Sequence, residues 1–400
     1  MARSAQQSKK RMMDGADIVG PRLILVLVVV ALILLGFVMI YSASSIKAIA
    51  AEDNAMSYMF NQIKFAVIGT VAAVVLWKAI PYRVWASNVV WIVWGVAVVL
   101  LLLTAVMGLS ENGAQRWLSL GPISLQPSEF VKIAIVLVAA RLFSDLRAHA
   151  IDARAFIVEI LLFIILPTGF LFATQSDLGT TAIIALGVIG VMWFGEVPLR
   201  VIFIVIGVML LFALFATVFS SYRGDRFLYL NPWNDGKNGY GNGYQIIHSY
   251  YAFAEGGIFG AGLGNSREKF LYLPESETDF IYAIIGEELG LIGAVLVIAA
   301  FLVLLWAGMR IARAATDDFG AMVAGSLTVM LVFQAFLNIG CAIGVFPTTG
   351  KPLPFISSGG SSLIASMMMI GIILAVSEGS GAAKTYERRR DDLRVVRRAS

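Results

Sequence analysis

Residues 23–40 read LILVLVVVALILLGFVMI, eighteen consecutive residues without one polar side chain. A helix of about 20 apolar residues crosses the hydrocarbon core of a bilayer, which is roughly 30 Å thick. Lipid offers no hydrogen bonds to an open backbone, so a segment that crosses it has to satisfy its own peptide groups as a helix. The stretch therefore predicts a transmembrane helix, and with it a membrane protein.

Similar apolar stretches recur along the chain. Of its 400 residues, 59% are hydrophobic and 14% are charged, and the mean hydropathy is +0.83, which excludes an ordinary soluble domain. The further candidate spans are 62–80, 84–107, 127–143, 155–173, 178–195, 201–220, 281–306, 319–345 and 361–378. Together with 23–40 they make ten helices, and an even number places both termini on one side. We expect an all-α polytopic membrane protein with ten transmembrane helices.

Basic residues predict the orientation of these helices. If the termini are cytoplasmic, 20 of the 30 Lys and Arg residues fall in inner segments, and every short inner loop obeys the positive-inside rule. We therefore expect a cytoplasmic basic N-terminus over 1–21, a membrane domain over 22–378 and a cytoplasmic basic tail over 379–400. The pI of about 9.1 follows from this topology, so it indicates contact with anionic lipid and not with nucleic acid.

Cysteine and histidine are too scarce for several kinds of chemistry. Cys341 is the single cysteine, so an intramolecular disulfide and a cysteine-based metal site are excluded. His149 and His248 are the two histidines of the chain. Their scarcity argues against zinc chemistry and against a histidine-based triad.

The longest polar segment runs from 222 to 280, between the seventh and eighth expected helices. With cytoplasmic termini it is a large extracellular loop, and it ends in YLPESETDF at 272–280, where the next span begins. This ending places three carboxylates, Glu275, Glu277 and Asp279, at one face of the membrane. We expect the chemistry of the protein at this lipid–water boundary.

Ionisable residues at membrane depth are a second signal, because they are costly there and usually functional. Glu129 and Lys132 stand three residues apart near the outer start of the fourth helix, where they can share a face and pair. Arg116 lies in the preceding outer loop, and Asp177 begins the sixth helix near its positive dipole end. An oxygen base beside cations at a membrane surface suits a lipid-linked phosphate substrate.

Each of these residues also has a purely structural interpretation. Glu129 and Lys132 can form a pair that only fixes helix packing, and Asp177 is more often a helix cap than a catalyst. Glu287 and Glu288, about two turns inside the eighth helix, fit buried polar networks between helices. The convergence of Arg, Lys and several carboxylates on one face is what favours a functional site over these alternatives.

Nine short motifs in a fixed order identify a family. They are QRWL (115–118), QPSEFVK (126–132), QSDLGT (175–180), GYQ (243–245), GLGNS (262–266), YLPESETDF (272–280), GEELG (286–290), PTTG (347–350) and LPFISSGGSS (353–362). With them the chain resembles the SEDS family (shape, elongation, division and sporulation proteins), polytopic peptidoglycan glycosyltransferases of bacteria. GLGNS followed closely by YLPE is more similar to the division branch than to the elongation branch. Ser358 stands where the family usually carries tyrosine.

The resemblance implies an activity that these residues can support. Members of the family polymerise lipid II by joining a disaccharide–pentapeptide acceptor to a glycan held on undecaprenyl diphosphate. The α-linked donor and the β-linked product imply a single inverting displacement, which needs a base for the acceptor hydroxyl and positive charge on the departing diphosphate. By this resemblance Asp279 is the base. Arg116 and Lys132 then contact the diphosphate, and Glu129 positions Lys132.

Further substrate contacts are expected around this group. They are Arg223 at the entrance of the large loop, Glu275, Asp177 and Ser357. No cofactor is expected. A divalent cation would assist the diphosphate, but no ligand cluster in the sequence demands one, so no metal site is assigned.

The resemblance also implies partners and a location. The partners are lipid II, the glycan on undecaprenyl diphosphate, membrane lipids, other division proteins and a class B penicillin-binding protein, which is a transpeptidase with one transmembrane helix. We expect that helix to pack on 319–345 and 361–378, where small residues allow close approach. These residues are Gly325, Ser326, Ser361, Ser362 and Gly371. The implied location is the cytoplasmic membrane of a bacterium, at the division septum.

Two other functions stay open at this point. A lipid II flippase would suit a ten-helix protein, but a transporter is expected to show inverted repeats and broken helices around a midplane site. The charged residues gather instead at the outer face, which favours surface chemistry. A scaffold that recruits and activates a transpeptidase is not excluded by the sequence, because one fold can scaffold and catalyse.

Overall fold

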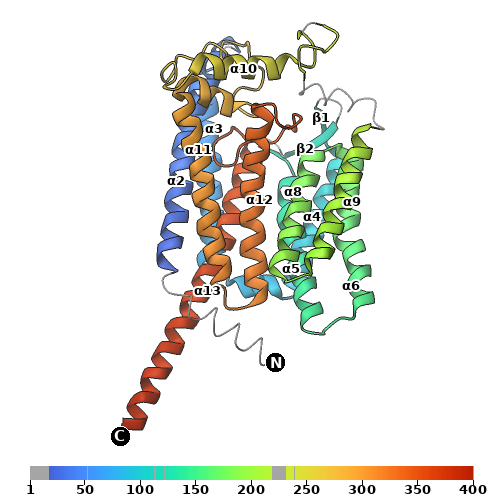
Figure 1. Ribbon diagram of the computed structural model, residues 1–400, viewed down its shortest axis with the longest axis vertical. Coiled ribbons are helices and arrows are strands. Elements are labelled where there is room, and N and C mark those ends of the chain that lie inside the picture. Colours follow the sequence, from blue (N-terminus) through green and yellow to red (C-terminus); the bar gives the residue numbers. More distant parts are fainter. Residues whose placement is uncertain are drawn as a thin grey trace.

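The computed structural model describes residues 18–51, 53–111, 114–120, 123–218, 231–237 and 239–399. In these residues a bundle of helices stands side by side, with a layer of loops and one short helix at one end (Figure 1). The helices are α2 (Val19–Ala50), α3 (Ser57–Lys78), α4 (Val89–Met107), α5 (Ser128–Arg147), α6 (Ala153–Ile160), α7 (Leu166–Gln175), α8 (Leu178–Phe194), α9 (Leu199–Val218), α10 (Tyr244–Gly256), α11 (Ile281–Arg313), α12 (Asp318–Ala342) and α13 (Gly360–Ala399). Arg223 lies outside the described residues, as does most of the segment 1–21.

Within the described residues, seven helical segments are long and apolar enough to cross a membrane. They are α2, α3, α4, the continuous segment from α6 to α7, α11, α12 and the part of α13 over Gly360–Gly379. The chain is therefore an all-α polytopic membrane protein. Helices α5, α8 and α9 also coincide with expected spans, but α8 and the apolar part of α9 are short, and α5 carries five charged residues. That all ten helices cross the membrane stays a prediction.

A small antiparallel sheet occupies the outer loop expected over 108–126, where no strand was expected. Its order is β1 (Leu109–Glu111), β2 (Ala114–Leu120) and β3 (Ile123–Leu125). The register pairs Leu118 of β2 with Leu125 of β3. Strand β2 also packs on α4 and α7, so the sheet holds Arg116 over the end of α7.

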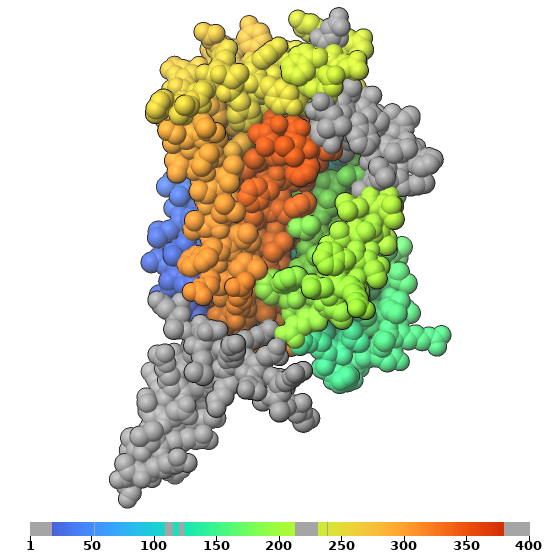
Figure 2. Space-filling view, viewed as in Figure 1, coloured from blue at the N-terminus to red at the C-terminus, as the bar shows by residue number. Residues whose placement is uncertain are grey.

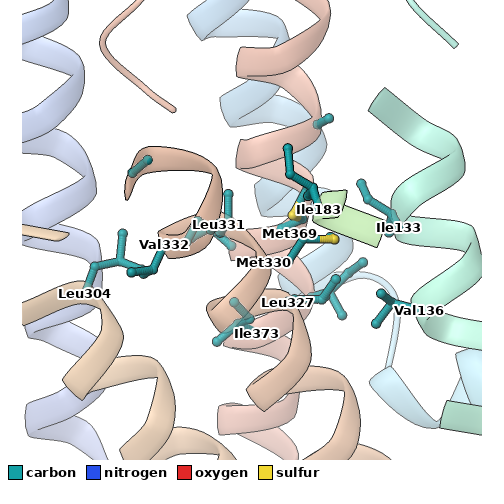
Figure 3. Close-up of a cluster of buried hydrophobic side chains, with 14 of the residues drawn as sticks. Ile133, Val136, Ile183, Leu304, Leu327, Met330, Leu331, Val332, Met369 and Ile373 are labelled. Atoms are coloured by element: carbon teal, nitrogen blue, oxygen red, sulfur yellow. The ribbon is translucent and has the colours of Figure 1, made fainter. Parts of the chain in front are cut away.

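The centre of the bundle is formed by α12 and the membrane part of α13. In each of them 83% of the most apolar 18-residue stretch is buried inside the protein, against 22% of the corresponding stretch in the peripheral α4. Figure 3 shows the packing: Leu327 and Met330 of α12 meet Ile183 of α8 and Val136 of α5. On the face drawn in Figure 2, the orange-red surface of α12 and the loop after it lies between orange α11 and green α8 and α9.

This burial corrects the expected docking face for a partner helix. A Cβ on Gly325 would lie 2.0 Å from the ring of Phe194, and one on Gly371 would lie 2.5 Å from the carbonyl oxygen of Ala73. Ser326, Ser361 and Ser362 are buried as well. The small residues of α12 and α13 thus serve close packing inside the chain, and the prediction that they form a partner face is wrong.

The segment from α6 to α7 is interrupted by a π-helical turn over Leu161–Ile165. Pro167 follows this turn, and a proline has no N–H to donate to the carbonyl four residues earlier, that of Phe163. Trp94 of α4 supplies the missing donor, because its Nε1 lies 2.8 Å from the carbonyl oxygen of Phe163. A break in a transmembrane helix is tolerated when a neighbouring helix satisfies the freed backbone group in this way.

Helix α11 is kinked at Gly290, whose φ of 69° is open to glycine but rarely to other residues. The chain after α10 packs into the kink: the N–H of Ala261 donates to the carbonyl of Glu287 at 2.9 Å, and that of Leu291 to Gly257 at 2.9 Å. A Cβ on Gly260 would lie 2.2 Å from the carbonyl oxygen of Glu288. The glycines after α10 therefore permit close approach of two backbones.

Candidate functional site

Asp279 lies two residues before α11, against the loop that joins α12 to α13. Asn338 of α12 uses both protons of its side-chain amide here, donating to the carbonyl of Asp279 at 2.8 Å and to the carbonyl of Lys351 at 2.8 Å. The hydroxyl of Ser357 donates to the carbonyl of Thr278 at 2.6 Å. These bonds hold the two segments together and fix the backbone from which the Asp279 side chain projects.

The carboxylate of Asp279 is half-buried, and it accepts no hydrogen bond from the described part of the chain. One of its oxygens, Oδ2, lies 3.5 Å from the position that a Cβ on Gly350 would take. Burial and the negative charge of Glu275 raise the pKa of Asp279 to about 6, although Lys351 and Arg116 act in the opposite direction. A carboxylate with a pKa near neutrality and free lone pairs suits a general base.

Asp177 and Lys351 form an ion pair at the base of this arrangement. Lys351 Nζ lies 2.6 Å from Asp177 Oδ2, and both side chains are 1% exposed. Asp177 also caps α8, accepting from the N–H of Thr180 at 2.9 Å and from its hydroxyl at 2.8 Å. Burial opposes ionisation of Asp177, but Lys351 and Arg116 outweigh it and hold its pKa below the ordinary range. The expected helix cap is therefore present, together with a charged partner that was not expected.

Glu129 and Lys132 of α5 pair as predicted, at 2.7 Å with neither side chain exposed. Lys132 Nζ also donates to Gln334 Oε1 of α12 at 2.7 Å. Gln334 in turn donates to the carbonyl of Pro352 at 3.0 Å. Lys132 is thus held on two sides inside the fold, and its side chain is not exposed. That it contacts a diphosphate stays a prediction.

Arg116 reaches the same region from β2. Its Nε donates to the carbonyl of Gln175 at 3.1 Å, and its positive charge acts on both Asp177 and Asp279. That Arg116 contacts the diphosphate stays a prediction. The other loop arginine of the expected set, Arg223, is outside the described residues.

Glu275 and Glu277 differ in their surroundings although they are two residues apart. Glu277 is buried and forms an ion pair with Lys47 of α2, whereas Glu275 is half exposed and lies 3.9 Å from the same lysine. Glu275 also closes the turn that contains Asp279, because its carbonyl accepts from the N–H of Phe280 at 3.1 Å. The structure thus brings Glu275 near the site as a residue that shapes the turn and adds negative charge.

The remaining expected contacts serve the fold. The hydroxyl of Ser357 donates to the carbonyl of Thr278 and also accepts from the N–H of Leu353 at 2.8 Å. Its proton and one of its lone pairs are therefore already engaged within the chain. Glu287 accepts from Ser266 and Arg267, and Glu288 accepts from Ser42. This confirms the interpretation of Glu287 and Glu288 as members of a buried polar network.

The residues that sequence reasoning missed are Lys351, Gln334 and Asn338. Lys351 lies between the expected spans 319–345 and 361–378, and the signal that could have found it is a cation between two glycine- and proline-containing motifs. Gln334 and Asn338 stand four residues apart in an apolar helix, and this spacing places them on one face. Among the described residues no three His, Cys, Asp or Glu side chains are grouped closely enough to hold a metal ion.

Comparison with known proteins assigns the chain to a family. The model of the FtsW, RodA and SpoVE cell cycle proteins matches residues 22–381. The chain belongs to this family, which is the SEDS family. Its SEDS relatives include stage V sporulation protein E of Bacillus subtilis, 39% identical over 364 residues that cover 90% of this chain and 98% of that protein. The probable peptidoglycan glycosyltransferase FtsW of Geobacter metallireducens is 40% identical over 370 residues, 89% of this chain and 94% of that protein.

Solved structures of SEDS proteins agree with the fold. The rod shape determining protein RodA of Thermus thermophilus matches with a TM-score of 0.64 at 26% identity, over 88% of this chain and 95% of that chain. A chain from a peptidoglycan synthase complex that coordinates polymerization and crosslinking matches with a TM-score of 0.69 at 27% identity, over 89% and 97%. The resemblance inferred from the nine motifs is confirmed.

Proposed function

We propose that this SEDS protein polymerises lipid II into glycan strands at the outer face of the cytoplasmic membrane, with Asp279 as the general base. Its relatives are probable peptidoglycan glycosyltransferases, and this is the activity assigned to the chain. The observation that carries the catalytic detail is the half-buried carboxylate of Asp279. Its backbone is fixed by Asn338, it accepts no hydrogen bond from the described part of the chain, and the charges of Lys351 and Arg116 act on it.

The chemistry is a single displacement at the anomeric carbon of the donor. Asp279 accepts the proton of the acceptor 4-hydroxyl. The oxygen of that hydroxyl forms the new glycosidic bond to the anomeric carbon. The bond from the anomeric carbon to the diphosphate oxygen breaks, and its electron pair leaves with the diphosphate. Arg116 stabilises the negative charge that accumulates there. Glu129 and Lys132 position this end of α5 against Gln334 and the loop after α12.

The orientation belongs to the proposal as well. The candidate site, α10 and the sheet lie at one end of the bundle, and α13 leaves from the opposite end (Figure 1). Basic side chains lie at that opposite end, such as Arg83 of η1 (Tyr82–Ala86), which pairs with Asp317 at the start of α12. Positive charge on the cytoplasmic side then puts Asp279 outside and the termini inside.

A transpeptidase partner and a septal location complete the proposal. One solved relative comes from a complex that coordinates polymerization and crosslinking, which supports a class B penicillin-binding protein as partner. The sporulation and division relatives are nearly equally similar, at 39% and 40% identity. The septal role therefore depends on the GLGNS and YLPE motifs.

Purified protein supplied with labelled lipid II tests the proposal. Glycan chains are expected, separated by length on a gel, and Asp279→Asn should make none. Movement of lipid II between the leaflets of a vesicle without polymer would indicate a flippase instead. Neither activity, from protein that still binds a transpeptidase, would indicate a scaffold.

A further inference from the structure

The two lysines of the candidate site differ in how firmly they are held. Lys132 has a carboxylate and an amide oxygen as acceptors, each at 2.7 Å. If Lys132 moved away, Glu129 would remain as a fully buried charge without a partner, and one of its oxygens, Oε1, already lacks a hydrogen bond among the described residues. Leaving a buried charge uncompensated costs several kcal/mol. Lys132 is therefore a fixed cation.

Lys351 is held by a single bond. Within the described residues its ammonium group donates to one acceptor, Asp177 Oδ2, although an ammonium has three donors. Lys351 also lies in a loop and not in a helix. Its stem lies over Gly179, where a Cβ would be 2.9 Å from Lys351 Cγ, so the absence of a side chain at Gly179 leaves it room.

Lys351 favours the ionised form of Asp177 more than any other group does, and further groups act in the same direction. The two oxygens of Asp177 keep the N–H and the hydroxyl of Thr180 at the start of α8, and the charge of Arg116 also favours its ionised form. A carboxylate at a helix N-terminus is stabilised by the helix dipole and by the free N–H groups there. Asp177 thus keeps two hydrogen bonds and a nearby cation after Lys351 has left it, whereas Glu129 has no donor besides Lys132 among the described residues.

The place next to Lys351 is open on the side of the proposed base. Gly350 has a φ of 65°, and a Cβ built there would lie 3.5 Å from Asp279 Oδ2, with no other described atom beyond its two chain neighbours within 4 Å. The charge of Lys351 already acts on Asp279. The backbone of both residues is fixed by the amide of Asn338, so a swing of the Lys351 side chain would bring its ammonium toward Asp279 without movement of the loop.

We propose that Lys351 is the exchangeable cation of the site: it leaves Asp177 to bind the diphosphate of the lipid-linked donor. This inference rests on the proposed function and deepens it. In the displacement, Lys351 keeps its own proton and binds the diphosphate oxygen that receives the electron pair of the broken bond. Asp177 is its resting partner, and after release of the diphosphate lipid the ion pair forms again.

Binding of a diphosphate lipid tests the exchange without any need for polymerisation. The probe is undecaprenyl diphosphate, titrated into the purified protein in detergent. Lys351→Met should bind it about 10- to 100-fold more weakly, because one charge-assisted bond is lost, and Lys351→Arg should stay within a few-fold of wild type. The exposed Lys64 of α3 gives the matched control, Lys64→Met, which should bind as wild type does.

Two variants of Asp177 separate exchange from simple charge pairing. Asp177→Asn should bind the probe at least as tightly as wild type, because Lys351 no longer has to leave a carboxylate. The double variant Asp177→Asn with Lys351→Met carries no unpaired charge and should fold even where Lys351→Met alone does not, yet it should bind as weakly as Lys351→Met. A double variant that binds like wild type would show that Lys351 only neutralises Asp177, and that would overturn the inference.

The outcomes also distinguish this inference from the proposed function. If wild type polymerises lipid II while Lys351→Met binds the probe as Lys64→Met does, the exchange is refuted and the polymerase stands. If wild type binds the probe through Lys351 but forms no polymer, the diphosphate site stands and the polymerase is refuted.

Discussion

At the scale of single residues, Asp279 combines properties that rarely occur together on a protein surface. Its backbone is fixed by Asn338, its carboxylate is half-buried, and among the described residues no donor satisfies that carboxylate. The oxygens of Asp279 are not among the buried polar atoms that lack a partner, so they are open to solvent. The hydroxyl of a substrate can therefore reach them.

Asp279→Asn should therefore abolish polymerisation while the protein folds normally. The substitution keeps the size of the side chain and removes its basicity, and general-base catalysis contributes about 10²- to 10⁴-fold to a rate. Polymer yield from labelled lipid II is the measurement, with thermal unfolding in detergent as the check on folding. A yield within a few-fold of wild type would exclude Asp279 as an essential base and shift attention to Glu129 or Glu275.

The same variant should reveal the pKa of Asp279 through stability. A carboxyl whose pKa is raised on folding, here from 3.8 to about 6, stabilises the fold below its unfolded pKa and loses that contribution as the pH rises through its folded pKa. Asp279→Asn should thus be more stable than wild type at pH 8, and this gain should vanish at about pH 4. Polymerisation by wild type should fall as the pH is lowered through about 6. Unfolding curves measured at both pH values, and a pH–rate profile, are the tests; an equal gain at pH 4 and pH 8 would mean that the effect is not the titration of Asp279.

Glu129 and Lys132 should behave as one unit. Lys132→Met leaves Glu129 as a buried, unpaired charge, which costs about 3–5 kcal/mol. The double change Glu129→Gln with Lys132→Met removes that charge and should be less destabilised than Lys132→Met alone. Thermal unfolding of the three variants measures the coupling. Additive losses would show that the two residues act independently and that the buried pair is not the reason for their positions.

At the scale of elements, two helices contain breaks that other elements satisfy. The kink of α11 at Gly290 receives the backbone of 257–262, which connects the large loop to the helix that begins beside Asp279. The π turn before Pro167 is satisfied by Trp94. In both cases a backbone group that a regular helix would have paired is paired by a neighbour, so the irregular geometry persists in lipid.

Trp94→Phe should destabilise the segment from α6 to α7. The substitution keeps an aromatic ring but removes the donor to the Phe163 carbonyl, and an unsatisfied buried acceptor costs about 1–3 kcal/mol. Trp193→Phe, at an exposed position of α8, is the matched control. A lower unfolding temperature for Trp94→Phe alone is expected. Equal unfolding temperatures for both variants would mean that water or another group satisfies the carbonyl.

At the scale of the whole molecule, the expected topology places the two ends of the bundle on opposite sides of the membrane. Cysteines introduced at Arg267, 80% exposed near α10, and at Arg83, 69% exposed at the opposite end, should react with an impermeant thiol reagent from opposite sides. Cys341 is buried, so background labelling should be low. Labelling of intact cells is expected at position 267 and not at 83. If both positions react from the same side, the ten-helix topology is refuted.

Much of this protein follows from the sequence by itself. Hydropathy predicted a helix over every expected span. The free energy of transfer from water to lipid is a property of each side chain, and these values sum over a local segment of the sequence. The i, i+3 spacing of Glu129 and Lys132 predicted their pair for the same reason, since helix geometry alone makes them neighbours. The motifs identified the family, and the carboxylates of 272–280 indicated the end of the molecule where the site lies.

Only the tertiary structure decided which distant groups meet. Asp177 and Lys351 are 174 residues apart in the chain, and Lys132 and Gln334 are 202 apart. Nothing local in either segment encodes these contacts, because the partner of a buried charge depends on how whole helices pack. Packing likewise turned the small residues of α12 and α13 inward, although their sequence suits a helix inside the bundle as well as a helix from a partner. The proposed base and Arg116 were visible in the sequence, whereas Lys351, the second cation that acts on Asp279, was assigned by the fold.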